Sequence, residues 1–214
     1  MPQDELGISV LKSACSSEAK DLAVEWAEIG LDTLFDEGVL KDAPILGSIV
    51  KLCMVSKTIR DRLFVRKVWD FLRGCPKFNN LEKMGFVREH LNDPEKAQKL
   101  GDAIVLILDK LDDLEKPSML AKLFAALVRC EIPLECFRRL ATAIDIGFIE
   151  DLKALAFPQK HAPDSLFIYL PNLVRTGLVE IGEKPDPSAY FESSYRLDFK
   201  VSQLGEIFIK CMNA

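Results

Sequence analysis

The chain has 214 residues, of which 49% are hydrophobic and 29% charged, and it carries a formal net charge of −5. This length allows one large domain or two small ones, and the apolar fraction is enough to build a hydrophobic core. The acidic pI of about 5.2 argues against a dedicated nucleic-acid-binding protein, because such domains are normally basic.

The six cysteines are scattered without a Cys-x-x-Cys pair, so the sequence predicts neither a disulfide framework nor a zinc site. His90 and His161 stand alone, and both are expected at the surface. The first residues, MPQDELGISV, lack the basic start and apolar run of a signal peptide. We therefore expect a cytoplasmic protein without metal or cofactor, and the periphery of the inner membrane is the alternative location.

Two regions precede the first proline-marked helix. Residues 1–17 are expected to form a loose lead-in or a short helix. Residues 18–35 follow as an amphipathic helix, with apolar residues near one face. Its acidic residues are Glu18, Asp21, Glu25, Glu28 and Asp32.

An apolar segment punctuated by Gly and Pro, within residues 38–73, runs into a basic helix. Asp42 is placed to cap this helix and Pro44 to occupy its first turn. In residues 51–77, eight Lys and Arg face only two Asp. A membrane-spanning helix is not expected, because a span needs about 20 mostly apolar residues and the basic residues interrupt this run. The apolar row at helical spacing is Ile45, Ile49, Leu52, Ile59 and Leu63.

Three interpretations of the basic helix remain open. In the first, its cations pair internally with the acidic helix of residues 18–35. In the second, it lies on anionic lipid, with Trp69 and Phe71 near the interface. In the third, it contacts the phosphates of a nucleic acid. The candidate contact residues are Lys57, Arg60, Arg62, Arg66, Lys67, Trp69 and Arg73.

Residues 81–91 are predicted to form a short helix, and residues 95–115 a longer one with the clearest apolar period in the chain. Asp93 caps this longer helix and Pro94 lies in its first turn. Carboxylates gather near its C-terminus, where the helix dipole disfavours negative charge. This acidic cluster is interpreted as a cation site, as a dock for the basic helix, or as a solvated helix end that Lys110 and Lys116 balance. Its members are Asp109, Asp112 and Asp113.

Pro117 and Pro133 each start a further helix, and residues 145–155 continue as another helix or a bent extension. The connections between these helices are short, which favours antiparallel neighbours in a helical bundle. The residues expected to face inward are Leu120, Leu123, Phe124, Leu127, Phe137, Leu140, Ala141 and Ile144.

The proline-rich C-terminal part has a different pattern. A helix ends at Gly177, the strand Leu178–Ile181 follows, and a polar loop leads to the strand Tyr195–Val201 and a last helix capped by Ser202. This order predicts a small winged-helix-like α/β unit with one β-hairpin. The loop has one Lys against three acidic residues, which favours a protein-contact or packing role over DNA binding.

Together these elements predict a mainly α fold. A helical domain of antiparallel helices is expected over residues 1–157, followed by the winged-helix-like unit over residues 158–214. No solenoid repeat is present.

The chain has no catalytic signature. It lacks a P-loop, a dinucleotide-binding glycine motif and a nucleophile elbow. Glu150–Asp151 and Asp112–Asp113 are adjacent in sequence rather than facing pairs, and are therefore poor acid/base dyads. We expect a non-enzymatic protein without catalytic residues.

Two stretches carry a resemblance to a known group. The helices MLAKLFAALVRCEIPLECFRRLATAIDIGFIEDLKAL and the closing LVRTGLVE and YRLDFKVSQLGEIFI resemble uncharacterised bacterial proteins of the Abi-alpha type. That group is associated by name with abortive infection, and often carries an apolar segment like GVLKDAPILGSIVKL. The resemblance implies a prokaryotic cytosolic protein with a role in phage defence, and it transfers no site residues.

The leading hypothesis is a non-enzymatic interaction or effector protein that acts through protein contacts or through a membrane-directed basic helix at about residues 44–73. The alternative is a winged-helix DNA-binding transcriptional regulator. We expect a protein partner, keep an anionic membrane as a second partner, and regard nucleic acid as less favoured. A homo-oligomer is left open.

Overall fold

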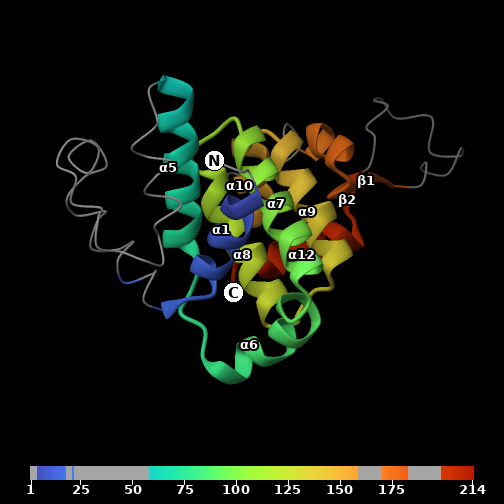
Figure 1. Cartoon of the computed structure of the whole chain (residues 1–214). Helices are drawn as coiled ribbons and strands as arrows, with labels where there is room; N and C mark the ends of the chain where they lie inside the picture. Colours follow the sequence, from blue (N-terminus) through green and yellow to red (C-terminus); the bar gives the residue numbers. More distant parts are fainter. Residues whose placement is uncertain (1–3, 18–20, 22–57, 159–169, 183–198) are drawn as a thin grey trace, which may run out of the picture. The chain divides into compact units, whose positions relative to one another are not determined.

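The computed structural model describes residues 4–17, 21, 58–158, 170–182 and 199–214 (Figure 1). These residues are mainly helical, with a two-stranded antiparallel sheet near the C-terminus. This confirms the predicted mainly α class with one small hairpin. Two compact units divide at residue 137, into 1–137 and 138–214. This division is not the same as the predicted domains 1–157 and 158–214, which stay a prediction.

The first unit is built from helices that follow the predicted order. In this unit the π-helix η2 continues directly from α6, so that the two together occupy the predicted helix of residues 81–91. The elements are α1 (Asp4–Ala14), α5 (Ile59–Gly74), α6 (Asn80–Phe86), η2 (Val87–Leu91), α7 (Pro94–Lys110) and α8 (Lys116–Val128), and α9 (Leu134–Ile146) begins here and ends in the second unit.

Helix α7 begins as predicted but ends earlier than predicted. The Asp93 carboxylate accepts the backbone N–H groups of Glu95 and Lys96, and Pro94 lies in the first turn. The helix stops at Lys110, because Leu111 has an extended backbone with φ −52° and ψ 128°. Because of this earlier stop, Asp112 and Asp113 lie outside the last turn of the helix, where the helix dipole would make their negative charges unfavourable.

Helix α8 is the centre of the first unit. It is buried along nearly its whole length, and its Phe124 lies at the middle of an aromatic cluster. The ring of Phe124 contacts Phe71 of α5, Phe86 of α6 and Phe137 of α9 edge-on, at centroid distances of 5.6, 5.7 and 6.5 Å. Edge-to-face pairs at such distances add to the stabilisation from burial alone. One side chain therefore connects four helices.

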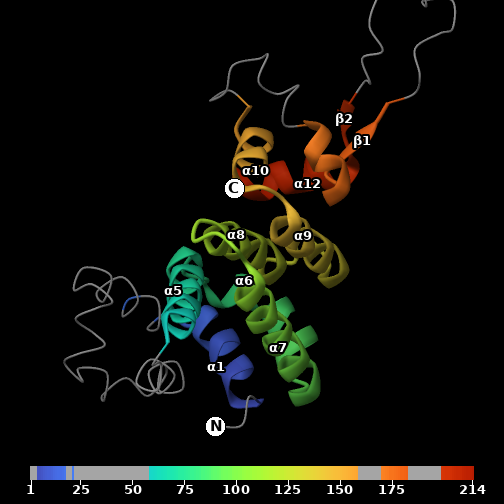
Figure 2. The same cartoon turned by 90° about the horizontal axis from the view of Figure 1, so that it is seen from above.

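Helices α1 and α7 lie side by side and cross at two glycines (Figure 2). A Cβ atom on Gly7 would lie 2.8 Å from the carbonyl carbon of Gly101, and one on Gly101 would lie 2.9 Å from the backbone nitrogen of Ile8. Only glycine leaves room for two backbones to approach this closely. The crossing places Val10 and Leu11 of α1 in the core.

The second unit contains the sheet. Its elements, besides the end of α9, are α10 (Ile149–Ala156), the 3₁₀ helix η4 (Val174–Thr176), β1 (Val179–Ile181), β2 (Phe199–Val201) and α12 (Gln203–Met212). Val179 pairs with Val201, and Glu180 with Lys200. Gly177 adopts the left-handed conformation with φ 76°, which ends η4 as predicted and turns the chain into β1.

Ser202 and Gly205 fix α12 against the sheet. The Ser202 hydroxyl accepts the Gly205 backbone N–H at 3.0 Å and donates to the Gly177 carbonyl at 2.6 Å, so it caps α12 as predicted. A Cβ on Gly205 would collide with the backbone of Leu178. At the other end of α12, the Asn213 side chain donates to the Ala156 carbonyl of α10 at 3.0 Å. The predicted loop at residues 182–193 lies almost wholly outside the described residues, so the winged-helix architecture stays a prediction.

Asp151 is a buried carboxylate in the first turn of α10. It is 2% exposed, one oxygen has no hydrogen-bond partner among the described residues, and Asn172 hydrogen-bonds the side chain. Burial raises the pKa of Asp151 above its usual 3.8. The folded state therefore binds the carboxyl proton of Asp151 more tightly than the unfolded state does. As a result, the free energy of unfolding falls as the pH rises from 3.8 through the raised pKa.

Replacement of Asp151 by Asn is expected to raise the melting temperature at neutral pH, because it removes the buried charge. The two proteins should melt at nearly the same temperature below pH 3.8, where the wild-type carboxyl is protonated in both states. Thermal unfolding across this pH range measures the difference. The exposed Glu206→Gln variant is the control, and an equal response of both variants to pH would contradict the prediction.

Candidate protein-contact surface

Helix α5 carries most of the candidate contact residues, and its ends are set by local sequence. The Thr58 hydroxyl accepts the Asp61 backbone N–H, and the Asp61 carboxylate accepts the Thr58 backbone N–H, both at 3.1 Å. This capping box satisfies two backbone donors that a helix start leaves without partners. The helix ends at Gly74, because Cys75 is extended and Pro76 follows it. The two ends of α5 are therefore set by the residues at and next to them.

One face of α5 lies in the core of the first unit. Phe71 reaches the aromatic cluster around Phe124, and the other buried residues follow at helical spacing. Trp69 is also buried, with 4% of its surface exposed. α5 is thus anchored by apolar contacts from Val65 onward. The buried residues are Val65, Val68, Trp69, Phe71 and Leu72.

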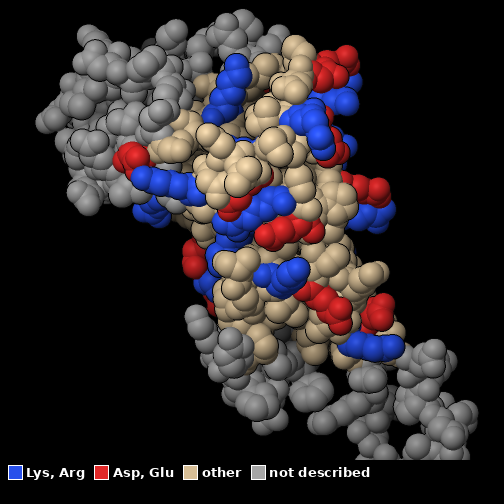
Figure 3. Space-filling model, turned by 90° about the horizontal axis from the view of Figure 1, so that it is seen from below, with Lys and Arg blue, Asp and Glu red and all other residues tan. Residues whose placement is uncertain are grey.

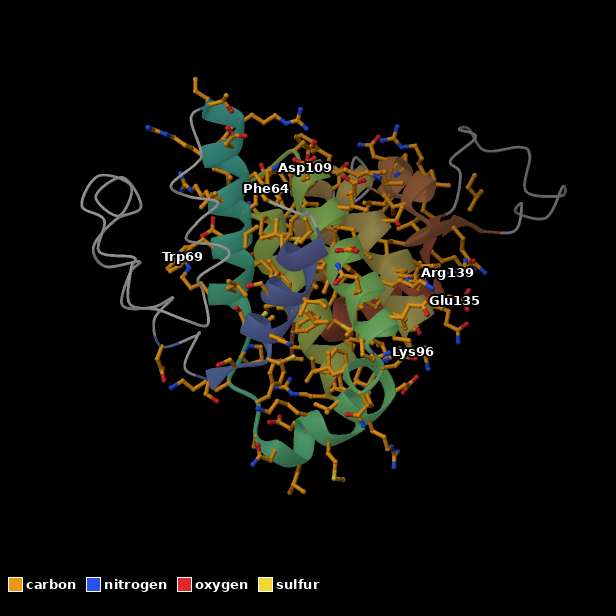
Figure 4. The ribbon with its side chains drawn as sticks, viewed as in Figure 1. Phe64, Trp69, Lys96, Asp109, Glu135 and Arg139 are labelled. Atoms are coloured by element: carbon orange, nitrogen blue, oxygen red, sulfur yellow. The ribbon has the colours of Figure 1, made fainter. Side chains whose placement is uncertain are left out.

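A second side of α5 meets the C-terminal end of α7. Arg60 forms an ion pair with the Asp109 carboxylate at 3.3 Å, and the Lys67 ammonium donates to the Asp109 backbone carbonyl at 2.9 Å. Figure 4 shows Asp109 at the end of α7 beside α5, close to Phe64 in that view. A cation at the last carbonyls of a helix is favourable with respect to the helix dipole. The exposed Arg60 pair itself contributes little, about 0–1 kcal/mol.

The remaining members of the acidic cluster are used locally. The Lys116 ammonium, which is 1% exposed, pairs with the Asp112 carboxylate at 2.5 Å. This hydrogen bond holds the pKa of Asp112 below its usual value, and the positive charge of Lys67 acts in the same direction. The Asp113 carboxylate accepts the Glu115 backbone N–H at 2.7 Å.

The cluster therefore shows features of two of its three interpretations. Asp109 receives the basic helix, and Asp112 is balanced by Lys116. In the ranges that the structure describes, no group of three His, Cys, Asp or Glu side chains is arranged to hold a metal ion.

The third side of α5 is exposed and combines apolar with basic side chains. Ile59 is 80% and Leu63 43% exposed, and these two residues lie one turn apart. Arg62 and Arg66 are exposed and also lie one turn apart, in the neighbouring row. Side chains three and four residues apart are neighbours on a helix, so the apolar and basic rows form one continuous strip. We call Ile59, Arg62, Leu63 and Arg66 the α5 strip.

Beyond the α5 strip the positive charge is partly neutralised. Asp70 lies between Arg66 at 3.8 Å and Arg73 at 3.1 Å. Burial raises the pKa of Asp70, while Arg73 and Arg66 lower it. The C-terminal half of the exposed side is therefore an acid between two bases, rather than a row of cations.

The structure separates the predicted contact residues into three groups. Arg60 and Lys67 dock α5 on α7, whereas Arg62, Arg66 and Arg73 lie on its exposed side. Trp69 is buried, and Lys57 lies outside the described residues. Sequence reasoning missed Ile59 and Leu63 as exposed residues, since it placed them in a single apolar row. The available signal was a second apolar row on α5, Val65, Val68 and Leu72. Only one of the two rows can face the core.

One predicted internal pair of the basic segment is present. The Lys77 ammonium lies 2.5 Å from the Asp21 carboxylate. The other acidic residues expected to pair with the basic segment, Glu18, Glu25, Glu28 and Asp32, lie outside the described residues. Lys77 lies beyond the end of α5, so the internal pairing of the basic helix with residues 18–35 stays a prediction.

His90 was predicted at the surface, and this prediction is wrong. The side chain is buried at 8% exposure, and its ring packs on Phe86 with centroids 5.2 Å apart. The spacing of four residues places His90 on the same helix side as Phe86, which is buried, so the signal was the apolar residue one turn earlier. His161 lies outside the described residues.

Charges of both signs are mixed on one face of the described residues. On the face shown in Figure 3, Lys and Arg side chains lie beside Asp and Glu side chains rather than gathering into a field of one sign. Arg129 with Glu82 and Lys99 with Glu95 are examples of such pairs. Among the helices that the structure describes, none is long and apolar enough to cross a membrane.

No protein-family model, curated protein or solved structure matches this chain. The likeness to the Abi-alpha group therefore stays an expectation from the sequence.

Proposed function

We propose that this chain is a non-enzymatic interaction protein that binds a protein partner through the α5 strip. The observation that carries the proposal is the pairing of exposed Ile59 and Leu63 with exposed Arg62 and Arg66 on a helix whose opposite face is anchored in the core. Arginine is enriched among the residues that contribute most to protein interfaces, and the exposed aliphatic side chains beside it add apolar area that excludes water from the contact.

The burial of the aromatic residues favours a protein partner over lipid. A helix that lies on a membrane inserts a broad apolar face, and its affinity scales with the apolar area buried. Trp69 and Phe71, which a lipid-facing α5 would use, are 4% and 0% exposed. Two exposed aliphatic side chains are a small area for insertion, but they suit the centre of a protein contact.

The charge pattern favours a protein partner over nucleic acid. Phosphate backbones attract surfaces with surplus Lys and Arg. Asp70 interrupts the basic side of α5, and in the hairpin Glu180 faces Lys200 across the two strands. These opposite charges neutralise each other locally, which weakens the support for the DNA-binding alternative.

A role in phage defence by abortive infection belongs to the proposal on the ground of the resemblance to the Abi-alpha group alone. The effector hypothesis then identifies the partner as a component of that response. The cytoplasmic location remains part of the same proposal.

A photo-cross-linking amino acid in place of Leu63 tests the proposed function in cells of the source organism. We expect it to capture a protein, because Leu63 lies within the α5 strip. The same residue in place of Lys96, which Figure 4 shows well apart from α5, is the matched control and should not capture that protein. Capture of only lipid or nucleic acid at position 63, or equal capture at both positions, would refute the proposal.

The background variant Arg62→Glu/Arg66→Glu should remove the capture without unfolding the chain, because both side chains are exposed and Asp70 keeps its closer ion pair with Arg73 at 3.1 Å. Arg60 and Lys67 are left unchanged, since their contacts with Asp109 dock α5 on α7. Circular dichroism checks that the helices remain. Undiminished capture in this variant would show that the arginines are not part of the contact.

A further inference from the structure

The α5 strip has the geometry of two parallel ridges. Ile59 and Leu63 form an apolar ridge, and Arg62 and Arg66 form a basic ridge beside it. Both ridges connect residues four apart, which are the rows that interdigitate when helices pack in the commonest way. A partner that matches both ridges must offer apolar side chains in one row and carboxylates in the next.

The basic segment already makes contacts of this kind within the molecule. Arg60 binds the carboxylate of Asp109 on another helix, and Lys77 binds the carboxylate of Asp21. In both cases a cation of residues 51–77 takes a carboxylate from a distant part of the chain. Arg62 and Arg66 belong to the same segment and reach solvent on the exposed side. Carboxylates are therefore the complementary groups for this ridge.

The backbone of α5 decides between a helix and a strand as the partner's element. A strand that adds to a partner needs an edge with free backbone donors and acceptors. α5 is helical from Ile59 to Gly74, so its backbone groups are bonded within the helix over this stretch. A helix satisfies its own backbone and presents side chains at the same spacing of three and four residues. The contact thus suits an amphipathic helix.

We propose that the partner presents an acidic amphipathic helix to the α5 strip, with its apolar row on Ile59 and Leu63 and its carboxylates facing Arg62 and Arg66. This inference rests on the proposed function and specifies the partner's chemistry. The two arginines supply bidentate donors that fit carboxylates well. The two apolar residues exclude water beside them, which strengthens those ion pairs.

Synthetic helical peptides test this inference with the full chain. The Glu peptide is an alanine-based helix with a stripe of Leu flanked by Glu, and the Lys peptide has Lys at each Glu position. We expect the wild-type protein to bind the Glu peptide about tenfold or more tightly than the Lys peptide, since Arg62 and Arg66 attract carboxylates and repel ammonium groups. Fluorescence anisotropy of labelled peptide gives both affinities.

A charge swap supplies a readout that loss of folding cannot imitate. The variant Arg62→Glu/Arg66→Glu should lose the Glu peptide and gain the Lys peptide. The matched control, Arg88→Glu/Lys96→Glu, has the same change in charge at exposed positions of η2 and α7, and should keep the wild-type preference. In Leu63→Ser, the apolar ridge is weakened, and both peptides should bind less tightly.

Several results would overturn the inference. Equal binding of both peptides to the wild-type protein would mean that only apolar adhesion is measured. A preference that survives the Arg62→Glu/Arg66→Glu change would place the site elsewhere. Absence of Glu peptide binding together with retention on vesicles of phosphatidylglycerol at physiological salt would make lipid the occupant. If cross-linking at position 63 captures a protein but the Glu peptide does not bind, the proposed function stands and only the partner's chemistry is wrong.

Discussion

Replacement of Phe124 by alanine is expected to lower the free energy of unfolding by about 3–5 kcal/mol. Phe124 is 0% exposed, and its ring contacts Phe71, Phe86 and Phe137. Its removal leaves a cavity between α5, α6, α8 and α9, which these helices cannot close together without losing contacts elsewhere. Urea unfolding followed by circular dichroism measures the loss. Ordinary domains are stable by about 5–15 kcal/mol, so a loss of this size leaves a domain at the lower end of that range partly unfolded.

Two further variants keep this prediction testable. Phe124→Leu retains most of the apolar volume and should destabilise by clearly less than Phe124→Ala. Phe148→Ala removes the same side chain from a position that is 64% exposed, and should change the free energy of unfolding by no more than about 0.5 kcal/mol. Equal losses for Phe124→Ala and Phe148→Ala would show that the aromatic cluster is not the centre of the core.

Gly101→Ala is expected to destabilise the first unit by about 1–3 kcal/mol or more, although alanine is the better helix former. The added Cβ would collide with the Gly7 backbone, and backbone atoms cannot rotate away as a long side chain can. α1 must therefore move off α7, which exposes Val10 and Leu11. Hydrogen exchange of α1, together with urea unfolding, measures the effect.

Leu106→Ala is the matched control on the same helix. Leu106 is 60% exposed, so its replacement should cost no more than about 0.5 kcal/mol and should leave exchange in α1 unchanged. If Gly101→Ala were instead stabilising, as its helix propensity alone predicts, the close crossing of α1 and α7 would be incorrect.

Much of the helical pattern could be predicted because the ends of several helices depend only on residues next to them in the sequence. Asp93 with Pro94 starts α7, and Ser202 caps α12, each through hydrogen bonds to the next few residues. The amphipathic period also identified the buried side of the later helices. All eight residues expected to face inward in the helices that begin near Pro117 and Pro133 are buried.

The candidate site was harder to predict because α5 offers two apolar rows. Ile59 and Leu63 form one row, and Val65, Val68 and Leu72 form the other. Periodicity gives the spacing of a row but does not decide which row meets the core, since that depends on the shape of the neighbouring helices. Here the partner is α8, and its Phe124 selects the row that can place Phe71 beside it.

For the long-range ion pairs, the sequence predicts which segments attract each other but not which residues pair. A dock for the basic helix is one of three interpretations that the sequence offers for the acidic cluster, yet nothing in the sequence selects Asp109 as the acceptor for both Arg60 and Lys67. That choice follows from where α7 stops. The early end at Lys110 leaves Asp109 in the last turn and turns Asp112 toward Lys116, which no period of apolar residues specifies.

The glycine crossing of α1 and α7 also has a consequence for the order of events during protein synthesis. α1 leaves the ribosome first, but the helix that receives it is separated from it by the sequence of α5 and α6. Until α7 has been made, Val10 and Leu11 have no partner in that helix, and the contact must then close a long loop. Contacts between residues far apart in sequence form slowly. The apolar side of the nascent α1 thus stays uncovered by α7 until that later helix has been synthesised.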